Sequence, residues 1–200
     1  MNEILVIGGG GHAKSCIDVI ESSKKYKIAG LVCESISEKI QYPVLGNDSH
    51  LQDLRKKYDY AIIGIGQIQS PEQRISAFNL VNNLEFKLPS IISPYSYLSK
   101  NATIGKGTVL FHFAVVNANA CVKDNCIINT KSLVEHDSMV SSHCHISTGA
   151  ILNGGVNIGE GSFVGSGAIV RESVDVGSNC TIGGGVFVRK NVKSNQVVKK

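Results

Sequence analysis

Residues 128–158 read INTKSLVEHDSMVSSHCHISTGAILNGGVNI, and every sixth residue of this stretch, starting at Ile128, is aliphatic. The same phase runs from Leu98 to Val188 and covers sixteen positions, all of them Ile, Leu or Val. The residue two before each of these positions is never larger than Val. A six-residue repeat with one aliphatic and one small inward position is typical of a β-helix, whose stacked coils bury a continuous apolar column. Three units make one coil, so the repeat predicts about five coils.

The residue that follows each aliphatic position is expected to turn the chain into the next strand. Gly occupies this position in five units, as at Gly105 and Gly159, and Asn occupies it in three others, as at Asn117. Gly and then Asn are the residues that best tolerate left-handed dihedral angles. We therefore expect the left-handed residue of each corner directly after the aliphatic position.

The composition argues against several classes of protein. The net charge is +4, from 20 basic and 16 acidic residues scattered along the chain, which disfavours a nucleic-acid groove. No apolar run approaches the length of a bilayer span, and the N-terminus does not read as a secretory leader. The cysteines form no CxxC pair and suggest no disulfide framework, so a cytoplasmic location is expected. Cys126, Cys144 and Cys180 fall on small inward positions and are expected to act as small core hydrophobes.

The segment before the repeat reads as an α/β domain. Residues 3–7 form a β-branched run, the glycines Gly8–Gly11 follow, and residues 12–20 have helical spacing. Strand, glycine turn and helix match the loose dinucleotide fingerprint, in which backbone N–H groups approach a phosphate at the helix N-terminus. Glu34 follows a second predicted strand, 27–33, where the fingerprint places an acid for a ribose hydroxyl. A purely steric role for the glycines is the alternative.

The rest of this segment completes one small domain. Residues 48–57 and 71–81 are predicted helices, and residues 60–66 are a third strand with a glycine turn. Residues 85–88 are expected to form a last short strand. Only one nucleotide-binding half fits here, so a full dinucleotide site is not expected. The period changes to six after Pro89, and we predict a Rossmann-like α/β domain over residues 1–88 and a parallel β-helix over residues 89–200.

Three of the six histidines lie within ten residues, between His136 and His145. His136 is two residues past the inward Val134, so it should point outward near a corner, with Asp137 beside it. An exposed imidazole beside a carboxylate can serve as a general base, because the anion stabilises the protonated form. One coil along the same face, Gly154 leaves room beside the imidazole, and its N–H is a candidate oxyanion donor.

Together these motifs resemble the two-domain bacterial sugar acetyltransferases of the hexapeptide-repeat family, which include sialic acid O-acetyltransferases and UDP-4-amino-sugar N-acetyltransferases. The resemblance covers nearly the whole chain. It implies a left-handed β-helix, a homotrimer, and acetyl-CoA lying between neighbouring helices. It further implies that His136 is the general base and that Asp137 raises its basicity.

The resemblance also implies the binding residues. Acetyl-CoA is expected along successive coils, at His145, Ser166 and Gly184. The nucleotide-linked sugar is expected at Gly10, Gly11, His12, Glu34, Gly66, Gln67 and Asn129. Of these, Glu34 and the Gly66–Gln67 turn are expected to line one pocket. Surface or solvent-satisfied histidines are the alternatives for His145 and His12. The chain lacks the proline-containing C-terminal segment with which many members hold coenzyme A, which leaves its phosphates to Arg189, Lys190 or Lys193.

The histidine cluster does not predict a metal site. Some β-helix proteins of the carbonic-anhydrase type hold zinc with three histidines across a subunit interface. His136, His143 and His145 lie too close together in one coil to match that long spacing.

Three functions remain open at this point. We predict acetyl-CoA-dependent N-acetylation of the amino group of a nucleotide-linked amino sugar, with UDP as the nucleotide, in bacterial glycan biosynthesis. O-acetylation of a sialic-acid-like sugar is the alternative, because one histidine base can serve either nucleophile. A non-catalytic accessory partner of a sugar-biosynthesis enzyme belongs to another class, and the His136–Asp137 pair argues against it.

Overall fold

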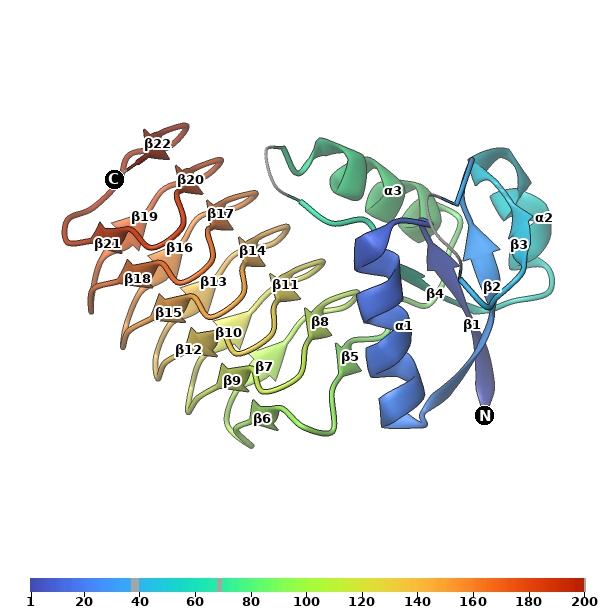
Figure 1. Cartoon of the computed structure of the whole chain (residues 1–200), viewed down its shortest axis with the longest axis horizontal. Helices are drawn as coiled ribbons and strands as arrows, with labels where there is room; N and C mark the ends of the chain where they lie inside the picture. Colours follow the sequence, from blue (N-terminus) through green and yellow to red (C-terminus); the bar gives the residue numbers. More distant parts are fainter. Residues whose placement is uncertain (37–39, 68–69, 200) are drawn as a thin grey trace.

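The computed structural model describes residues 1–36, 40–67 and 70–199, and shows an α/β domain beside a β-helix (Figure 1). The N-terminus lies in the α/β domain and the C-terminus at the far end of the β-helix. No helix within the described residues is long and apolar enough to cross a bilayer.

The N-terminal domain is a parallel sheet with the strand order β3-β2-β1-β4. Its elements are β1 (Asn2–Ile7), α1 (Gly11–Ser23), β2 (Tyr26–Val32), β3 (Val44–Gly46), the 3-10 helix η1 (Asp48–His50), α2 (Leu51–Arg55), β4 (Tyr60–Ile63) and α3 (Glu72–Asn83). Ile4 and Val6 of β1 pack in the cluster that contains α1, whereas Leu5 and Ile7 pack with residues of α2 and α3. Helices therefore cover both faces of the sheet, which explains why the consecutive residues 4–7 of β1 are all apolar and buried.

This domain follows the sequence-based prediction with three differences. The three-residue edge strand β3 is not predicted from the sequence. The helix expected over residues 48–57 is divided into η1 and the five-residue α2. The strand expected over residues 85–88 is reduced to one bridge between Tyr60 and Lys87, because Glu85 adopts a left-handed conformation with φ of 61°.

The β-helix has three faces, each a parallel sheet of two-residue strands. The β5 face contains β5 (Ile91–Ile92), β8 (Val109–Leu110), β11 (Ile127–Ile128), β14 (His145–Ile146), β17 (Phe163–Val164), β20 (Thr181–Ile182) and β22 (Val197–Val198). The β6 face contains β6 (Tyr97–Leu98), β9 (Val115–Val116), β12 (Leu133–Val134), β15 (Ile151–Leu152), β18 (Ile169–Val170) and β21 (Phe187–Val188). The β7 face contains β7 (Thr103–Ile104), β10 (Cys121–Val122), β13 (Met139–Val140), β16 (Asn157–Ile158) and β19 (Asp175–Val176).

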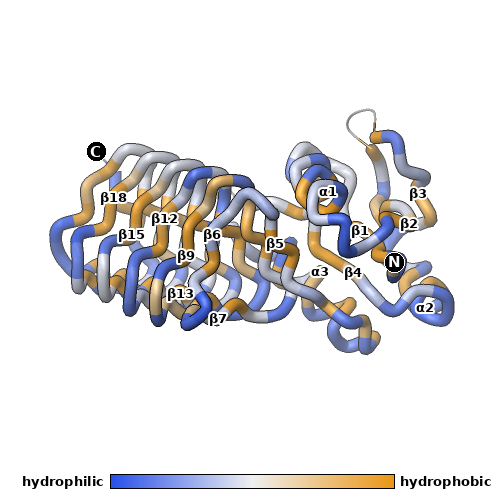
Figure 2. Tube along the Cα trace, turned by 90° about the horizontal axis from the view of Figure 1, so that it is seen from below, coloured by the Kyte–Doolittle hydropathy of each residue, from blue (hydrophilic) through white to orange (hydrophobic). Residues whose placement is uncertain are grey.

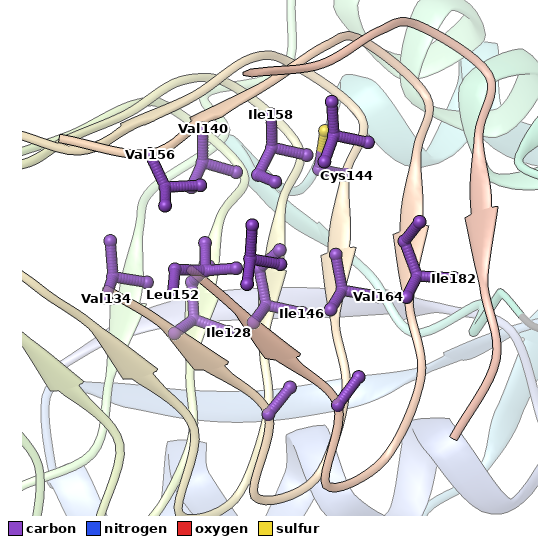
Figure 3. Packing of buried hydrophobic residues seen from close by; sticks show 14 of the residues in the cluster. Ile128, Val134, Val140, Cys144, Ile146, Leu152, Val156, Ile158, Val164 and Ile182 are labelled. Atoms are coloured by element: carbon purple, nitrogen blue, oxygen red, sulfur yellow. The ribbon is translucent and has the colours of Figure 1, made fainter. Parts of the chain in front are cut away.

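The register of the strands confirms the six-residue period. Stacked strands pair residues eighteen positions apart, as Leu133 does with Ile151. From Leu110 to Ile182 every residue at the aliphatic position is at most 2 % exposed. Figure 3 shows Val134, Ile146 and Val164 among the side chains that fill this interior. Apolar segments recur at the same place in each coil (Figure 2). This recurrence is expected because a single coil cannot bury its apolar residues without its neighbours.

The residues with left-handed backbone dihedral angles do not lie where the sequence pattern predicted them. Positive φ falls three residues after the aliphatic position, as at Asn119, Asp137 and Gly155, and not directly after it. The glycines directly after the aliphatic position have a different role. A Cβ at Gly105 or Gly159 would lie 2.3 or 2.4 Å from an atom of the next coil. These glycines permit close stacking of successive corners.

Small inward residues at the corner between the β7 and β5 faces are all hydrogen-bond donors. The column contains Thr108, Cys126, Cys144, Ser162 and Cys180. Cys144 Sγ donates to Gly159 O at 3.1 Å, and Ser162 Oγ donates to Gly177 O at 2.8 Å. The cysteines are buried, as predicted, and each thiol also donates to a backbone carbonyl of the next coil.

The N-terminal domain is fixed to the β5 face near its first coils. Residues of α1 share an apolar cluster with Ile91, Val109 and Ile127. His112 joins the two domains, because its Nε2 lies 2.7 Å from Asp18 Oδ2 and its Nδ1 lies 2.6 Å from Ser93 Oγ. Ser93 is 2 % exposed, so this Ser–His–Asp series is a structural link and not a nucleophile open to a substrate.

We propose Pro89 as the boundary between the two domains. Lys87 still bridges to Tyr60 of the N-terminal sheet, whereas Ile91 pairs with Val109 of the β-helix.

Candidate functional site

His136 lies at the corner between the β6 and β7 faces, in the turn that connects β12 to β13. Its side chain is 61 % exposed, and its Nδ1 lies 2.8 Å from Asp137 Oδ2. Asp137 has a φ of 60°, and its Oδ1 accepts a hydrogen bond from Asn119 Nδ2 at 3.2 Å. The turn therefore holds the carboxylate against the imidazole from one side and against the neighbouring coil from the other.

This pairing decides which nitrogen of His136 is available. An ionised carboxylate only accepts hydrogen bonds, so Nδ1 carries the proton and Nε2 is left bare. The hydrogen bond that His136 donates to Asp137, together with the charge of the carboxylate, raises the pKa of His136, and the same bond lowers the pKa of Asp137. A bare Nε2 on an imidazole of raised basicity is suited to accept a proton.

Gly154 lies directly against the His136 ring. A Cβ at this residue would lie 2.6 Å from Cε1 and 2.7 Å from Nε2 of His136. The absence of a side chain thus leaves the ring in place and keeps the approach to Nε2 open.

A second group of predicted residues meets in a cavity between the two domains, about 560 Å³ in volume. This interdomain cavity is lined by Gly11, His12, Ser15, Gly66, Gln67, His145, Ser147, Phe163 and Ser166. It combines residues expected to hold the sugar nucleotide, such as His12 and Gln67, with residues expected to hold acetyl-CoA, His145 and Ser166. Ser15, Ser147 and Phe163 are lining residues that the sequence did not single out.

His145 is held in one tautomer inside this cavity. Its Nδ1 lies 2.8 Å from Gln67 O, which can only accept, so Nδ1 is the protonated nitrogen. Its Nε2 lies 3.1 Å from Asn129 Nδ2, while Asn129 Oδ1 accepts from Thr130 N at 2.8 Å. Burial lowers the pKa of His145 to about 4, and the ring is neutral at pH 7. Asn129, predicted as a sugar ligand, thus contacts His145.

His12 contributes a buried polar atom to the cavity. Its Nε2 is buried and has no hydrogen-bond partner in the described part of the chain. Its ring lies 5.5 Å from Phe111 and 6.4 Å from His145, centroid to centroid. Burial, followed by the charges of His145 and Arg74, lowers the pKa of His12 to about 3. A neutral imidazole with an unpaired nitrogen is available to a ligand.

Glu34 does not join this cavity, which corrects the prediction that it shares one pocket with the Gly66–Gln67 turn. Glu34 lines a separate cavity of about 540 Å³ at the carboxyl end of the parallel sheet, with Gly8, Asp48 and Glu72. The Gln67 side chain turns the other way, because its Nε2 donates to Gly161 O of the β-helix at 3.0 Å. Gly11 lines the interdomain cavity, Gly10 precedes it as the N-cap of α1, and a Cβ on either would meet nothing within 4 Å.

The remaining predicted residues follow the β-helix. Ser166 Oγ lies 3.0 Å from Ser147 Oγ, and a Cβ at Gly184 would lie 3.2 Å from Ser166 O in the next coil. His145, Ser166 and Gly184 therefore mark successive coils, as predicted. His136 is not among the residues that line the interdomain cavity. Among the described residues no group of three His, Cys, Asp or Glu side chains is arranged to hold a metal ion.

Two protein families match parts of the chain. The PglD N-terminal domain family matches residues 3–78, and the bacterial transferase hexapeptide family, described by six repeats, matches residues 155–190. A comparison with curated protein sequences finds no match.

Solved structures match nearly the whole chain. The acetyltransferase domain of PglB from Neisseria gonorrhoeae, in complex with acetyl coenzyme A, is 31 % identical, covers 99 % of this chain and 96 % of its own, and has a TM-score of 0.92. The chain belongs to the hexapeptide-repeat sugar acetyltransferases. PerB from Caulobacter crescentus, in complex with CoA and GDP-perosamine, is 28 % identical, covers 98 % and 93 % of the two chains, and has a TM-score of 0.91.

Family membership confirms the predicted fold class, a Rossmann-like domain followed by a left-handed β-helix. It also confirms the resemblance seen in the sequence. A histidine-to-alanine variant of GDP-perosamine N-acetyltransferase from Caulobacter crescentus, again with CoA and GDP-perosamine, has a TM-score of 0.92 at 27 % identity over 98 % of this chain and 93 % of its own.

Proposed function

We propose that this protein transfers the acetyl group of acetyl-CoA to the amino group of a nucleotide-linked amino sugar in bacterial glycan biosynthesis, with His136 as the general base. The observation that carries this proposal is the exposed His136–Asp137 pair, whose bare Nε2 lies beside Gly154. The full-length likeness to PglB with acetyl-CoA and to PerB with GDP-perosamine supports both substrates.

The reaction needs no acyl-enzyme. The sugar amine attacks the thioester carbonyl, and Nε2 of His136 accepts the proton that the nitrogen releases. The tetrahedral oxyanion then collapses, the C–S bond breaks, and the thiolate leaves and takes up the proton from His136. In this scheme the Gly154 N–H donates to that oxyanion. Asp137 keeps Nδ1–H in place and stabilises the imidazolium that forms during transfer.

The binding residues divide between the two cavities. The cavity lined by Glu34 lies at the carboxyl ends of parallel strands, where open α/β sheets bind ligands. It suits the nucleoside, and the exposed N-terminus of α1 at Gly10 and Gly11 suits the diphosphate. The interdomain cavity, with His12, Gln67 and His145, then receives the sugar or the thioester end of acetyl-CoA.

The exposed β6 face supports a homotrimer. Its outward residues are apolar in all six strands: Tyr97, Val115, Leu133, Ile151, Ile169 and Phe187. Tyr97 is 57 % exposed and Phe187 is 48 % exposed in the single chain, which is unfavourable for a continuous apolar stripe in water. A second and a third copy of this chain would cover it.

Such a trimer would also complete the site. The β6 face is flanked by two corners, one bearing Ser147 and Ser166 and the other bearing His136. When three copies pack their β6 faces around a threefold axis, the first corner of one copy meets the second corner of the next. His136 of one protomer would then face the interdomain cavity of its neighbour, and acetyl-CoA would lie between two β-helices.

Thiol release from acetyl-CoA tests the proposal. The wild type is assayed with UDP- and GDP-linked amino sugars and with free and CMP-linked sialic acids, beside His136→Ala and the exposed control His50→Ala. We expect turnover with a UDP-linked amino sugar that is lost in His136→Ala and kept in His50→Ala. Turnover with GDP-linked amino sugars alone would show that the nucleotide of the substrate is GDP and not UDP.

The other two functions have their own outcomes in the same assay. Turnover with sialic acids alone would establish the O-acetyltransferase. A protein that neither binds acetyl-CoA nor releases thiol would favour the accessory partner.

A further inference from the structure

Arg74 is the most unusual buried group outside the residues already assigned. It lies on α3, is 1 % exposed, and forms no ion pair with a carboxylate in the part of the chain that the structure describes. A buried guanidinium without a counter-charge is costly unless hydrogen bonds replace its water. The hydrogen-bond partners of Arg74 therefore indicate why the chain keeps a buried guanidinium at this position.

Two of these partners are backbone carbonyl groups in successive coils, at the corner between the β7 and β5 faces of the β-helix. Arg74 donates to Asn125 O through Nη1 and to His143 O at 2.6 Å through Nη2. The next carbonyl in the series, Gly161 O, accepts from Gln67 Nε2 at 3.0 Å. Asn125, His143 and Gly161 occupy the same corner position in three successive coils, each with positive φ. Arg74 and Gln67 thus cap consecutive corner carbonyls with donors from the N-terminal domain.

Arg74 also fixes the orientation of Gln67. Its Nη2 donates to Gln67 Oε1, which leaves Gln67 Nε2 as the donor to Gly161. With both ends of its amide occupied, Gln67 cannot rotate, and its backbone carbonyl is held toward His145 Nδ1 at 2.8 Å. The chain of directed bonds runs from Arg74 through Gln67 to His145 and on to Asn129.

We propose that Arg74 is a positioning residue for acetyl transfer, which docks the Gly66–Gln67 turn on the β-helix and thereby holds His145 in a single orientation and tautomer. Arginine suits this role because its planar fork reaches two carbonyls and an amide oxygen at once, which an ammonium group cannot do. The kinetic part of the proposal rests on the proposed function, whereas the state of His145 can be measured without any substrate.

The test uses three variants and one matched control. Arg74→Lys keeps the charge and loses the fork, Arg74→Met loses both, and Gln67→Met removes the link without touching Arg74. Asp18→Asn is the control, because Asp18 joins the same two domains through His112, in a contact that does not involve the cavity. Should Arg74→Met fail to fold, Arg74→Lys and Gln67→Met decide the matter.

The first readout is the ring-nitrogen NMR spectrum of histidine-labelled protein, with His145→Gln used to assign its signals. We expect one neutral tautomer of His145, protonated at Nδ1, in the wild type and in Asp18→Asn. We expect a mixture of tautomers in Arg74→Lys and Gln67→Met. The second readout is kinetic: displacement of a positioned group by about 1 Å can cost roughly 100-fold, so we expect kcat/KM for acetyl-CoA to fall by that order in Arg74→Lys.

An unchanged His145 tautomer in Arg74→Lys and Gln67→Met would overturn the proposal. So would kinetic losses that Asp18→Asn reproduces, because they would reflect domain docking alone. A wild type that acetylates no sugar would refute the proposed function, and the tautomer spectra would then decide the positioning of His145 by themselves.

Discussion

Gly154→Ala is the substitution that most sharply tests the geometry around His136. The added Cβ would lie 2.6 Å from Cε1 and 2.7 Å from Nε2, whereas ordinary contact begins near 3.4 Å. The ring must therefore move by about 0.8 Å, the difference between 3.4 and 2.6 Å. A displacement of about 1 Å at a reacting group can cost roughly 100-fold in rate, so we expect kcat to fall by about that factor.

The stability of Gly154→Ala should not fall with its activity, and should be equal to or slightly above that of the wild type. Gly154 is not among the residues with positive φ, so Ala fits its backbone and reduces the freedom of the unfolded chain. We therefore expect a thermal midpoint at or slightly above that of the wild type. A loss of activity without a loss of stability separates displacement of the base from damage to the fold.

Thiol release from acetyl-CoA under saturating sugar measures kcat, and differential scanning calorimetry measures stability. The double variant His136→Ala/Gly154→Ala is the control, because Gly154→Ala should add nothing once the imidazole is gone. Unchanged kcat and KM in Gly154→Ala would refute both the contact and the proposed oxyanion role. A further loss in the double variant would show that Gly154 acts apart from His136.

Two other predictions follow from the same structure. In Asp137→Asn the pKa of His136 should fall, because the carboxylate that raises it is gone. Nε2 of His136 would then lose its proton at lower pH. The acid limb of the pH profile of kcat/KM should therefore shift to lower pH, and its plateau should be lower. Asp175→Asn removes the charge of a carboxylate that accepts a comparable bond from Asn157 at 2.7 Å; it should leave the profile unchanged, and a shift in the profile would contradict this assignment. Cys144→Ala should cost about 0.5–1.5 kcal/mol, because it removes the thiol donor to Gly159 O and leaves that carbonyl with the Ser162 N–H alone, and the thermal midpoint should fall by a few degrees. Cys144→Ser should recover most of this loss, as Ser162 makes the same bond one coil along; equal midpoints for the Ala and Ser variants would show that the donor is unimportant.

The repeat could be predicted from the sequence almost completely because each unit contacts only its neighbours. The inward phase of Val134, Ile146 and Val164, and the outward placement of His136, follow from counting alone. The position of the left-handed residues did not follow. Gly follows the aliphatic residue because successive corners stack closely, as at Gly159. In the sequence alone, a glycine required by close stacking looks the same as a glycine required by a left-handed dihedral angle.

Arg74 could have been recognised as buried before the structure was known. It precedes Ala77, Phe78 and Val81 at the spacing of one helix face, and all three are buried. An arginine in phase with core residues indicates an internal polar contact. Nothing in that phase indicates its partners, because Asn125 and His143 lie 51 and 69 residues further along the chain.

The sequence by itself determined the β-helix, the glycine turn before α1, and the His136–Asp137 pair, because each depends on residues close together or on a strict period. Only the tertiary structure decided that His12, Gln67 and His145 share a cavity, and that Glu34 lies in a different one. The contact between Gln67 and His145 spans 78 residues and depends on how one domain docks on the other. That docking is set by Arg74, by Asp18 with His112, and by the apolar contacts of α1, and no periodicity along the chain encodes it.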